Sequence, residues 1–212
     1  MNKLAIFGSN NLGQLIAYHA INDARYNFVG FFDNKKMKGS RSGIGSIIGD
    51  VNDVERLYSQ KFFDCLMIGV GYYQFDYRRK VYELFKNIIP FANIIHTSSY
   101  IDDSCVLGEG IFILPGCVLD KGVELEDNVL LNTGCTIAHD SIIKKHSFIA
   151  PSVNIAGHVI IGESCFIGIG TTIIDNIQIS ANTQTGGGAV IINNIDKPGL
   201  YVGVPGFCIR EY

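Results

Sequence analysis

The chain has 212 residues, of which 47% are apolar and 17% are charged, so it holds enough apolar material for a core in one or two domains. Its formal net charge of −3 gives no basic field for a nucleic acid, and we expect no such partner. The apolar run at residues 4–7 is too short for a signal peptide or a membrane span. These features predict a cytoplasmic protein without membrane insertion.

Residues 1–95 alternate short apolar runs with helical patterns. Residues 3–7 predict a buried strand that leads into the segment GSNNLG and then into a helix. Further on, the pattern predicts a strand at 28–33, a strand fragment and a helix between 46 and 60, a strand within DCLMIGVG, and a helix over 75–87. This alternation indicates a small Rossmann-like α/β domain.

The segment GSNNLG, residues 8–13, is the candidate ligand-binding turn of this domain. A glycine-rich turn that opens a helix directs backbone N–H groups and the positive helix end at an anion, commonly a phosphate. Asp33 ends the second predicted strand, where dinucleotide-binding domains place an acidic residue, but the glycine spacing differs from GxGxxG. Three interpretations stay open: a nucleotide-linked ligand, which we favour, a purely structural turn, and NAD(P).

Residues 101–196 form sixteen consecutive six-residue units in one unbroken register. Each unit opens on Ile or Leu, except the one that opens on Thr185, and its fifth residue is small or β-branched. A period of six fits neither a helix nor one long strand. It is typical of short strands joined by tight corners in a parallel β-helix, with three units to a turn, which we call a coil. Residues one coil apart then lie directly above one another, about 4.8 Å apart.

The chain contains six cysteines, which could indicate disulfides or a metal site. No CxxC pair occurs. Four of the cysteines stand fifth in a six-residue unit, where a small, readily buried side chain suits a narrow interior: Cys105, Cys117, Cys135 and Cys165. We interpret these four as core residues and expect no metal.

Units such as LGEGIF, LEDNVL and IGESCF match the repeat of the hexapeptide-repeat acyltransferases, which the chain therefore resembles. The resemblance implies a left-handed β-helix over residues 96–212, with a C-terminal cofactor loop, and a homotrimer. The handedness rests on the resemblance alone, because the general rule for parallel crossovers favours the right-handed form.

The whole chain resembles the sugar acyltransferases that modify nucleotide-activated or sialic sugars, in particular the N-acetyltransferases of 4-amino-4,6-dideoxy sugar nucleotides used for surface glycans. The motifs that carry this likeness are FGSNNLG, LNTGCTIAHD, APSVNIAGHVIIG, GIGTTI and YVGVP.

His139 has the surroundings that acetyl transfer needs. Transfer from a thioester to an amine requires a base and donors for the developing oxyanion, and histidine is the natural base near neutral pH. His139 stands near a corner with Asp140 beside it, and Gly157, one coil later, lies above it and leaves room for a thioester. From position alone, an exposed corner residue is the alternative. His146 and His158 stand one place later in their units, and we expect both at the surface.

The resemblance assigns roles to individual residues. It makes His139 the general base and Asp140 the residue that holds its tautomer, and the stacking of Gly157 over His139 makes the Gly157 N–H the expected oxyanion donor. It places Asn132 near the acceptor amine, where a corner-capping amide is an equal alternative. Acetyl-CoA would lie between the β-helices of two subunits, along Gly157, Ile169, Gly187, Gly188, Gly203 and Pro205. The sugar nucleotide would contact Asn10, Asn11, Leu12, Asp33, Asn34 and Gly71.

The sequence thus predicts an acetyl-CoA-dependent enzyme that acetylates the 4-amino group of a nucleotide-linked 4-amino-4,6-dideoxy sugar. Residues 1–95 would bind the sugar nucleotide, and the β-helix would carry the acetyltransferase chemistry. Two alternatives remain: an O-acetyltransferase acting on sialic acid or a related sugar, and a non-catalytic scaffold or binding module.

Overall fold

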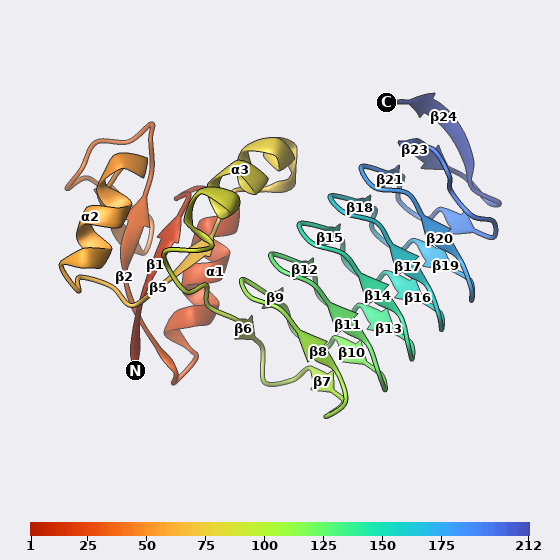
Figure 1. Cartoon of the computed structure of the whole chain (residues 1–212), viewed down its shortest axis with the longest axis horizontal. Coiled ribbons are helices and arrows are strands. Elements are labelled where there is room, and N and C mark those ends of the chain that lie inside the picture. The colour runs from red at the N-terminus through yellow and green to blue at the C-terminus, as the bar shows by residue number, and fades with distance from the viewer. The chain divides into compact units, whose positions relative to one another are not determined.

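The structure is a computed structural model that describes all 212 residues, apart from the side chain of Tyr72. The chain divides into two compact units, Met1–Ile94 and Ile95–Tyr212 (Figure 1). The first unit mixes helices and strands, and the second is built almost entirely of two-residue strands.

The N-terminal unit contains one sheet with the strand order β3-β4-β2-β1-β5. Strands β1, β2, β4 and β5 run parallel, and β3 pairs with β4 antiparallel. In chain order the elements are β1 (Asn2–Phe7), α1 (Asn11–Ile21), β2 (Tyr26–Phe32), β3 (Arg41–Ser42), β4 (Gly45–Gly49), the 3₁₀ turn η1 (Val51–Asp53), α2 (Val54–Ser59), β5 (Cys65–Ile68), the 3₁₀ turn η2 (Tyr72–Gln74) and α3 (Phe75–Phe85).

The core of this unit follows from its apolar patterning. The four residues that end β1 are all buried, as are the four of β5, so these two neighbouring strands are covered on both sides. Helix α3 buries Arg78, Val81, Tyr82 and Phe85, whose spacing of three and four residues places them on one helical face. The predicted strands and helices of this unit are present, with ends that differ by up to two residues.

The second unit is a left-handed parallel β-helix with three faces, as expected. The first face contains β7 (Tyr100–Ile101), β10 (Val118–Leu119), β13 (Thr136–Ile137), β16 (Asn154–Ile155), β19 (Thr172–Ile173) and β22 (Val190–Ile191). The second face contains β8 (Val106–Leu107), β11 (Glu124–Leu125), β14 (Ile142–Ile143), β17 (Ile160–Ile161) and β20 (Gln178–Ile179). The third face contains β6 (Ile94–Ile95), β9 (Phe112–Ile113), β12 (Leu130–Leu131), β15 (Phe148–Ile149), β18 (Phe166–Ile167), β21 (Gln184–Thr185), β23 (Gly199–Val202) and β24 (Phe207–Glu211).

Strands on one face pair with the strands one coil away, as Leu119 does with Ile137 and Ile137 with Ile155. The chain passes from the third face to the first, then to the second, and returns to the third. We call the three edges between them the third–first, first–second and second–third corners. β24 closes the third face as its only antiparallel strand.

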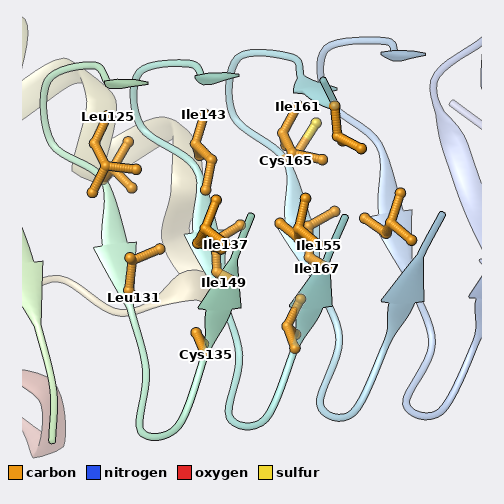
Figure 2. Close-up of a cluster of buried hydrophobic side chains, with 14 of the residues drawn as sticks. Leu125, Leu131, Cys135, Ile137, Ile143, Ile149, Ile155, Ile161, Cys165 and Ile167 are labelled. Atoms are coloured by element: carbon orange, nitrogen blue, oxygen red, sulfur yellow. The ribbon is translucent and has the colours of Figure 1, made fainter. Parts of the chain in front are cut away.

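The interior of the prism is filled by the residues that open each unit and by those at its fifth place. Figure 2 shows these side chains stacked in columns, with Ile137 and Ile155 in one and Leu131, Ile149 and Ile167 in another. Cys117, Cys135 and Cys165 are buried among them and Cys105 is partly buried, which agrees with their interpretation as core residues.

The fourth place of most units adopts a positive φ that turns the chain at the corner. Glycine is frequent there, as at Gly134, but Asn128, Asp140, His146 and His158 also hold φ values between +56° and +65°. Asparagine, aspartate and histidine enter this region more readily than most other residues with a Cβ.

The expectation that His146 lies at the surface is wrong, because its side chain is only 1% exposed. His146 lies directly above Asn128 at the second–third corner, and its Nδ1 is 2.9 Å from the Asn128 amide nitrogen. Both side chains are buried at this corner, so a place at a turn does not by itself imply contact with water.

Among the helices in the described part of the chain, none combines the length and the apolar character that a membrane crossing requires.

We predict that Ile149→Ala lowers the free energy of unfolding by about 2–5 kcal/mol, because it leaves a cavity in a fully buried column. Denaturant unfolding of the parent and the variant measures this loss. Thr136→Ala, on the exposed side of β13, is the control and should change the value by less than about 0.5 kcal/mol. Equal losses in both variants would contradict the assigned interior.

Candidate active site

His139 and Asp140 lie at the first–second corner, directly after β13. The Nδ1 atom of His139 is 2.9 Å from Oδ2 of Asp140. Asp140 occupies the corner position with φ +57°, and its backbone N–H donates to the carbonyl of Lys121 one coil below. The carboxylate is thereby fixed beside the imidazole, and with Nδ1–H donating to it, Nε2 keeps the lone pair that a base needs.

Gly157 lies on the next coil, against the His139 ring. A Cβ at this position would come within 2.8 Å of both Cε1 and Nε2 of the imidazole. Only glycine therefore leaves the ring in its observed place. The prediction that Gly157 stands above His139 is confirmed by this contact.

Asp140 is ionised more readily than an ordinary aspartate. The hydrogen bond from His139 lowers the pKa of its carboxyl and outweighs the opposing effect of burial, and the charges of His158, His139 and Lys121 lower the pKa further. A carboxylate that stays charged can hold the imidazole in one tautomer and can stabilise its protonated form.

His158 is the residue of this site that the sequence reasoning missed. It is exposed, as expected, but its Nε2 lies 3.9 Å from Oδ2 of Asp140, and its ring meets that of His139 edge-on at 5.1 Å between centroids. The signal was available in the sequence, because His158 follows Asp140 by one coil.

Asn132 lies at a different corner from His139. It follows β12 at the third–first corner, where its Oδ1 accepts a hydrogen bond from the N–H of Thr133. This contact is the corner-capping role that stood as its alternative. The first face of the prism separates the two corners, so one chain does not place Asn132 next to His139.

The expected cofactor residues lie mainly at the third–first corner. The Ile169 side chain is 59% exposed, and Gly187 lies above it, where a Cβ would come within 3.1 Å of the Ile169 side chain. Gly188 has φ +69° and would have open space around a Cβ. Gly203 and Pro205 follow β23 in the turn to β24, with Gly203 at φ +96°. These residues form a strip of small or exposed groups along one edge and the closing turn.

In the N-terminal unit, three glycines allow the backbone segments after β1 and β5 to touch. A Cβ on Gly13 would lie 1.9 Å from the Gly8 carbonyl, and a Cβ on Gly69 would lie 2.6 Å from the Gly13 Cα. These segments meet where the strand order switches direction, since β2 lies on one side of β1 and β5 on the other. Ligands of open α/β sheets bind at such switch points, outside the carboxyl ends of the strands.

The residues predicted to contact a nucleotide gather at these strand ends in two groups. Asn10 and Asn11 are exposed and Leu12 is partly buried at the start of α1, and Gly71 has open space beside it after β5. Asp33 and Asn34 follow β2, and their side chains make hydrogen bonds to other residues of the chain. The Asn34 side chain accepts from the Val51 N–H and donates to the Tyr77 hydroxyl.

Asp33 is a structural anchor of the glycine-rich turn. Its Oδ2 accepts from the Ser9 hydroxyl at 2.5 Å and from the Ser9 N–H at 3.3 Å, and Oδ1 accepts from the Lys35 N–H at 2.9 Å. Burial raises the pKa of the Asp33 carboxyl, but these hydrogen bonds outweigh it and hold the pKa below its ordinary value. The carboxylate therefore already has partners before any ligand binds.

Arg78 is a second residue that sequence reasoning missed. Its side chain is 1% exposed, and its guanidinium donates to the carbonyls of Ile68 and Val70, on either side of Gly69. Burial lowers the pKa of Arg78 to about 10, so the group stays charged at neutral pH. It thus holds the segment after β5 and adds a positive charge at this end of the sheet. In the sequence, only the position of Arg78 on the apolar face of α3 could have indicated that its side chain is buried.

We predict that Ser9→Ala raises the pKa of Asp33. The variant loses the Ser9 hydroxyl, one of the hydrogen-bond donors that offset the effect of burial on this carboxyl. In the parent, the depressed pKa stabilises the fold above the unfolded pKa of about 3.9, and this contribution is lost as the pH falls through the folded value. NMR titration of the carboxyl carbon measures the change, and Ser46→Ala, at an exposed position of β4, is the control. An unchanged Asp33 titration would show that the Ser9 hydroxyl does not hold the carboxylate.

No protein-family model matches the chain. Solved structures do match it over nearly its full length. The acetyltransferase domain of PglB from Neisseria gonorrhoeae is 26% identical, with a TM-score of 0.89 over 99% of this chain and 100% of that domain. The same domain in complex with acetyl coenzyme A is 25% identical, with a TM-score of 0.88 over 98% of this chain and 99% of that one.

A variant of perosamine N-acetyltransferase from Caulobacter crescentus, in complex with CoA and GDP-perosamine, shares the fold at 22% identity. Its TM-score is 0.88, over 98% of this chain and 97% of that chain. The resemblance that the sequence indicated is confirmed by these full-length matches, and the chain has the fold of acetyl-CoA-dependent sugar N-acetyltransferases. From end to end, the chain thus shares its fold with solved structures of hexapeptide-repeat sugar N-acetyltransferases.

Proposed function

We propose that this protein transfers an acetyl group from acetyl-CoA to the 4-amino group of a nucleotide-linked 4-amino-4,6-dideoxy sugar. The observation that carries the proposal is the corner where His139 bonds to Asp140 and packs on Gly157. That corner belongs to a chain whose full length matches an acetyltransferase domain known in complex with acetyl coenzyme A.

His139 is the general base of this reaction. As the sugar amine attacks the thioester carbonyl, a C–N bond forms and the amine proton passes to Nε2, while Nδ1–H stays bonded to Asp140. The oxyanion that develops on the former carbonyl is stabilised by the Gly157 N–H. The C–S bond then breaks, and the imidazolium returns the proton to the thiolate, which leaves free CoA and the amide.

Acetyl-CoA runs along the strip formed by Ile169, Gly187 and Gly188 and ends at the turn with Gly203 and Pro205. The exposed Ile169 offers apolar surface to the pantetheine arm, and the glycines let the arm approach the backbone closely. The PglB domain with acetyl coenzyme A and the perosamine enzyme with CoA support this donor.

The N-terminal unit binds the nucleotide part of the acceptor. The N–H groups at the start of α1, the open space at Gly71 and the buried charge of Arg78 all favour an anion such as a diphosphate at the switch point. The perosamine enzyme with bound GDP-perosamine supports a nucleotide-linked amino sugar as the acceptor class. Asn10, Asn11 and Leu12 are the side chains at this point that can select among such sugars.

The active unit is a homotrimer. His139 and Gly157 lie at one edge of the first face, and Asn132, Ile169 and Gly187 lie at the other. A single β-helix therefore keeps the base, His139, apart from the strip that binds acetyl-CoA. A second copy of the chain can bring its own acetyl-CoA strip next to His139 of the first. The neighbouring subunit then supplies Asn132 to the acceptor amine.

We predict that His139→Ala lowers kcat by about 10²–10⁴, the usual cost of removing a general base, while affinity for acetyl-CoA and thermal stability hardly change. Thiol release with amino- and hydroxyl-bearing nucleotide sugars measures this, and His19→Ala in α1 is the control. A His139→Ala protein within threefold of the parent, with chemistry rate-limiting, would refute the mechanism. Thiol release with hydroxyl sugars alone would refute the amine as acceptor.

We also predict that light scattering gives three times the chain mass of 23.2 kDa at micromolar concentration. The reason is the separation of the base and the donor strip on one prism. A stable monomer with full activity would contradict the trimer and the shared site.

A further inference from the structure

We propose that His139, Asp140 and His158 form a binding site for a divalent transition-metal ion such as Zn²⁺. One ligand atom from each of the three residues lies within 4.8 Å of the others. The two pairs that include Asp140 Oδ2 measure 2.9 Å to His139 Nδ1 and 3.9 Å to His158 Nε2. Since Zn²⁺ holds such ligands at about 2.0–2.2 Å, two of them stand roughly 3.3 Å apart in a tetrahedral site, between the two observed values.

The β-helix fixes this spacing through its backbone. Asp140 and His158 occupy the same corner place on successive coils, both with φ +57°. The N–H of His158 donates to the carbonyl of His139 at 3.1 Å, which joins the two coils at this corner. Only side-chain torsions separate the observed arrangement from a closed site, so little order must be gained on binding.

In the single chain, the corner is open to an ion from solution. The side chains of His139, Asp140 and His158 are 50%, 47% and 56% exposed. Glycines stand next to the cluster at Gly157 and Gly122, and a Cβ on Gly122 would come within 2.7 Å of Asp140 Oδ1. Three protein ligands on an open corner leave further coordination positions for water.

The donor set selects the class of metal. Imidazole nitrogens suit zinc, copper and nickel, whereas magnesium and calcium prefer oxygen ligands. The carboxylate of Asp140 supplies the negative charge, and Lys121, whose charge acts on Asp140, opposes the cation to some extent. We therefore expect zinc to bind and magnesium to leave the site empty.

Occupancy would switch off acetyl transfer, a consequence that rests on the proposed function. A neutral imidazole that binds a metal through Nδ1 carries its proton on Nε2. Nε2 then points a donor at the acceptor amine and cannot take the amine proton. The metal also removes Asp140 from its bond with His139. Zinc would therefore inhibit the reaction by occupying the nitrogen and the carboxylate that keep His139 in its basic form.

The direct test measures the binding of ZnCl₂ to the full-length protein by calorimetry or equilibrium dialysis. All proteins carry Cys208→Ser, because Cys208 is an exposed thiol that could bind zinc by itself. We expect His158→Ala to weaken zinc binding by at least about tenfold, the scale on which outer partners of metal ligands already act. His19→Ala, in α1, is the control and should bind zinc like the parent. Circular dichroism verifies that the variants are folded.

Equal zinc affinity of the parent and His158→Ala would overturn the site, as would the absence of zinc binding by the parent. Asp140→Asn gives a second, independent variant and should also weaken binding. Equal binding of MgCl₂ and ZnCl₂ would overturn the assignment to transition metals.

Inhibition is tested separately, as the rate with zinc divided by the rate without it for each variant. The parent should lose activity at zinc concentrations that fill the site, and His158→Ala should need at least about tenfold more zinc for the same fractional loss. Zinc binding without any acetyl transfer to amino sugars would refute the proposed function and support the site. Full acetyl transfer by a zinc-loaded parent would overturn the inhibition.

Discussion

The stacking of equivalent residues on successive coils governs this structure. Each interior column is a row of aliphatic side chains, such as Ile137 above Leu119 and below Ile155, and the backbone hydrogen bonds between coils keep these rows in register. Because burial of such rows drives folding, the sequence has little freedom at two of every six positions. The corners, by contrast, are fixed in place, and their residues vary more, within what a positive φ at the fourth place allows. The chemistry of the second unit lies at these corners.

A corner places its side chains by backbone geometry, without dedicated supports. His139 meets Gly157 and Asp140 meets His158 because the members of each pair are one coil apart. The N-terminal unit solves the same problem differently. There, close contact among Gly8, Gly13 and Gly69 and the hydrogen bonds from Ser9 to Asp33 hold the strand ends together. One unit uses periodicity and the other uses small residues and a buried carboxylate.

Much of this could be predicted from the sequence, and the reason is periodicity. The regular spacing of the residues that open each six-residue unit predicted the three faces, the inward-facing cysteines and the position of Gly157 over His139. His158 was also within reach, since it follows Asp140 by one coil. The burial of His146 was not, because exposure at a corner depends on what packs there and leaves no trace in the six-residue pattern. Likewise, Asp33 could be identified as important, but its bond to Ser9 depends on how the two strand ends approach each other.

The fixed length of the coil also limits how the length of this protein can vary during evolution. Gain or loss of a single residue within the prism would turn every later opener away from the interior. Gain of one six-residue unit would keep the interior intact but would carry each later corner to the next edge, so that an insertion between His139 and Gly157 would part them. Only steps of a whole coil preserve both burial and alignment. A longer homologue would therefore be expected to differ by whole coils, with the closing hairpin of β23 and β24 displaced along the axis by about 4.8 Å for each one.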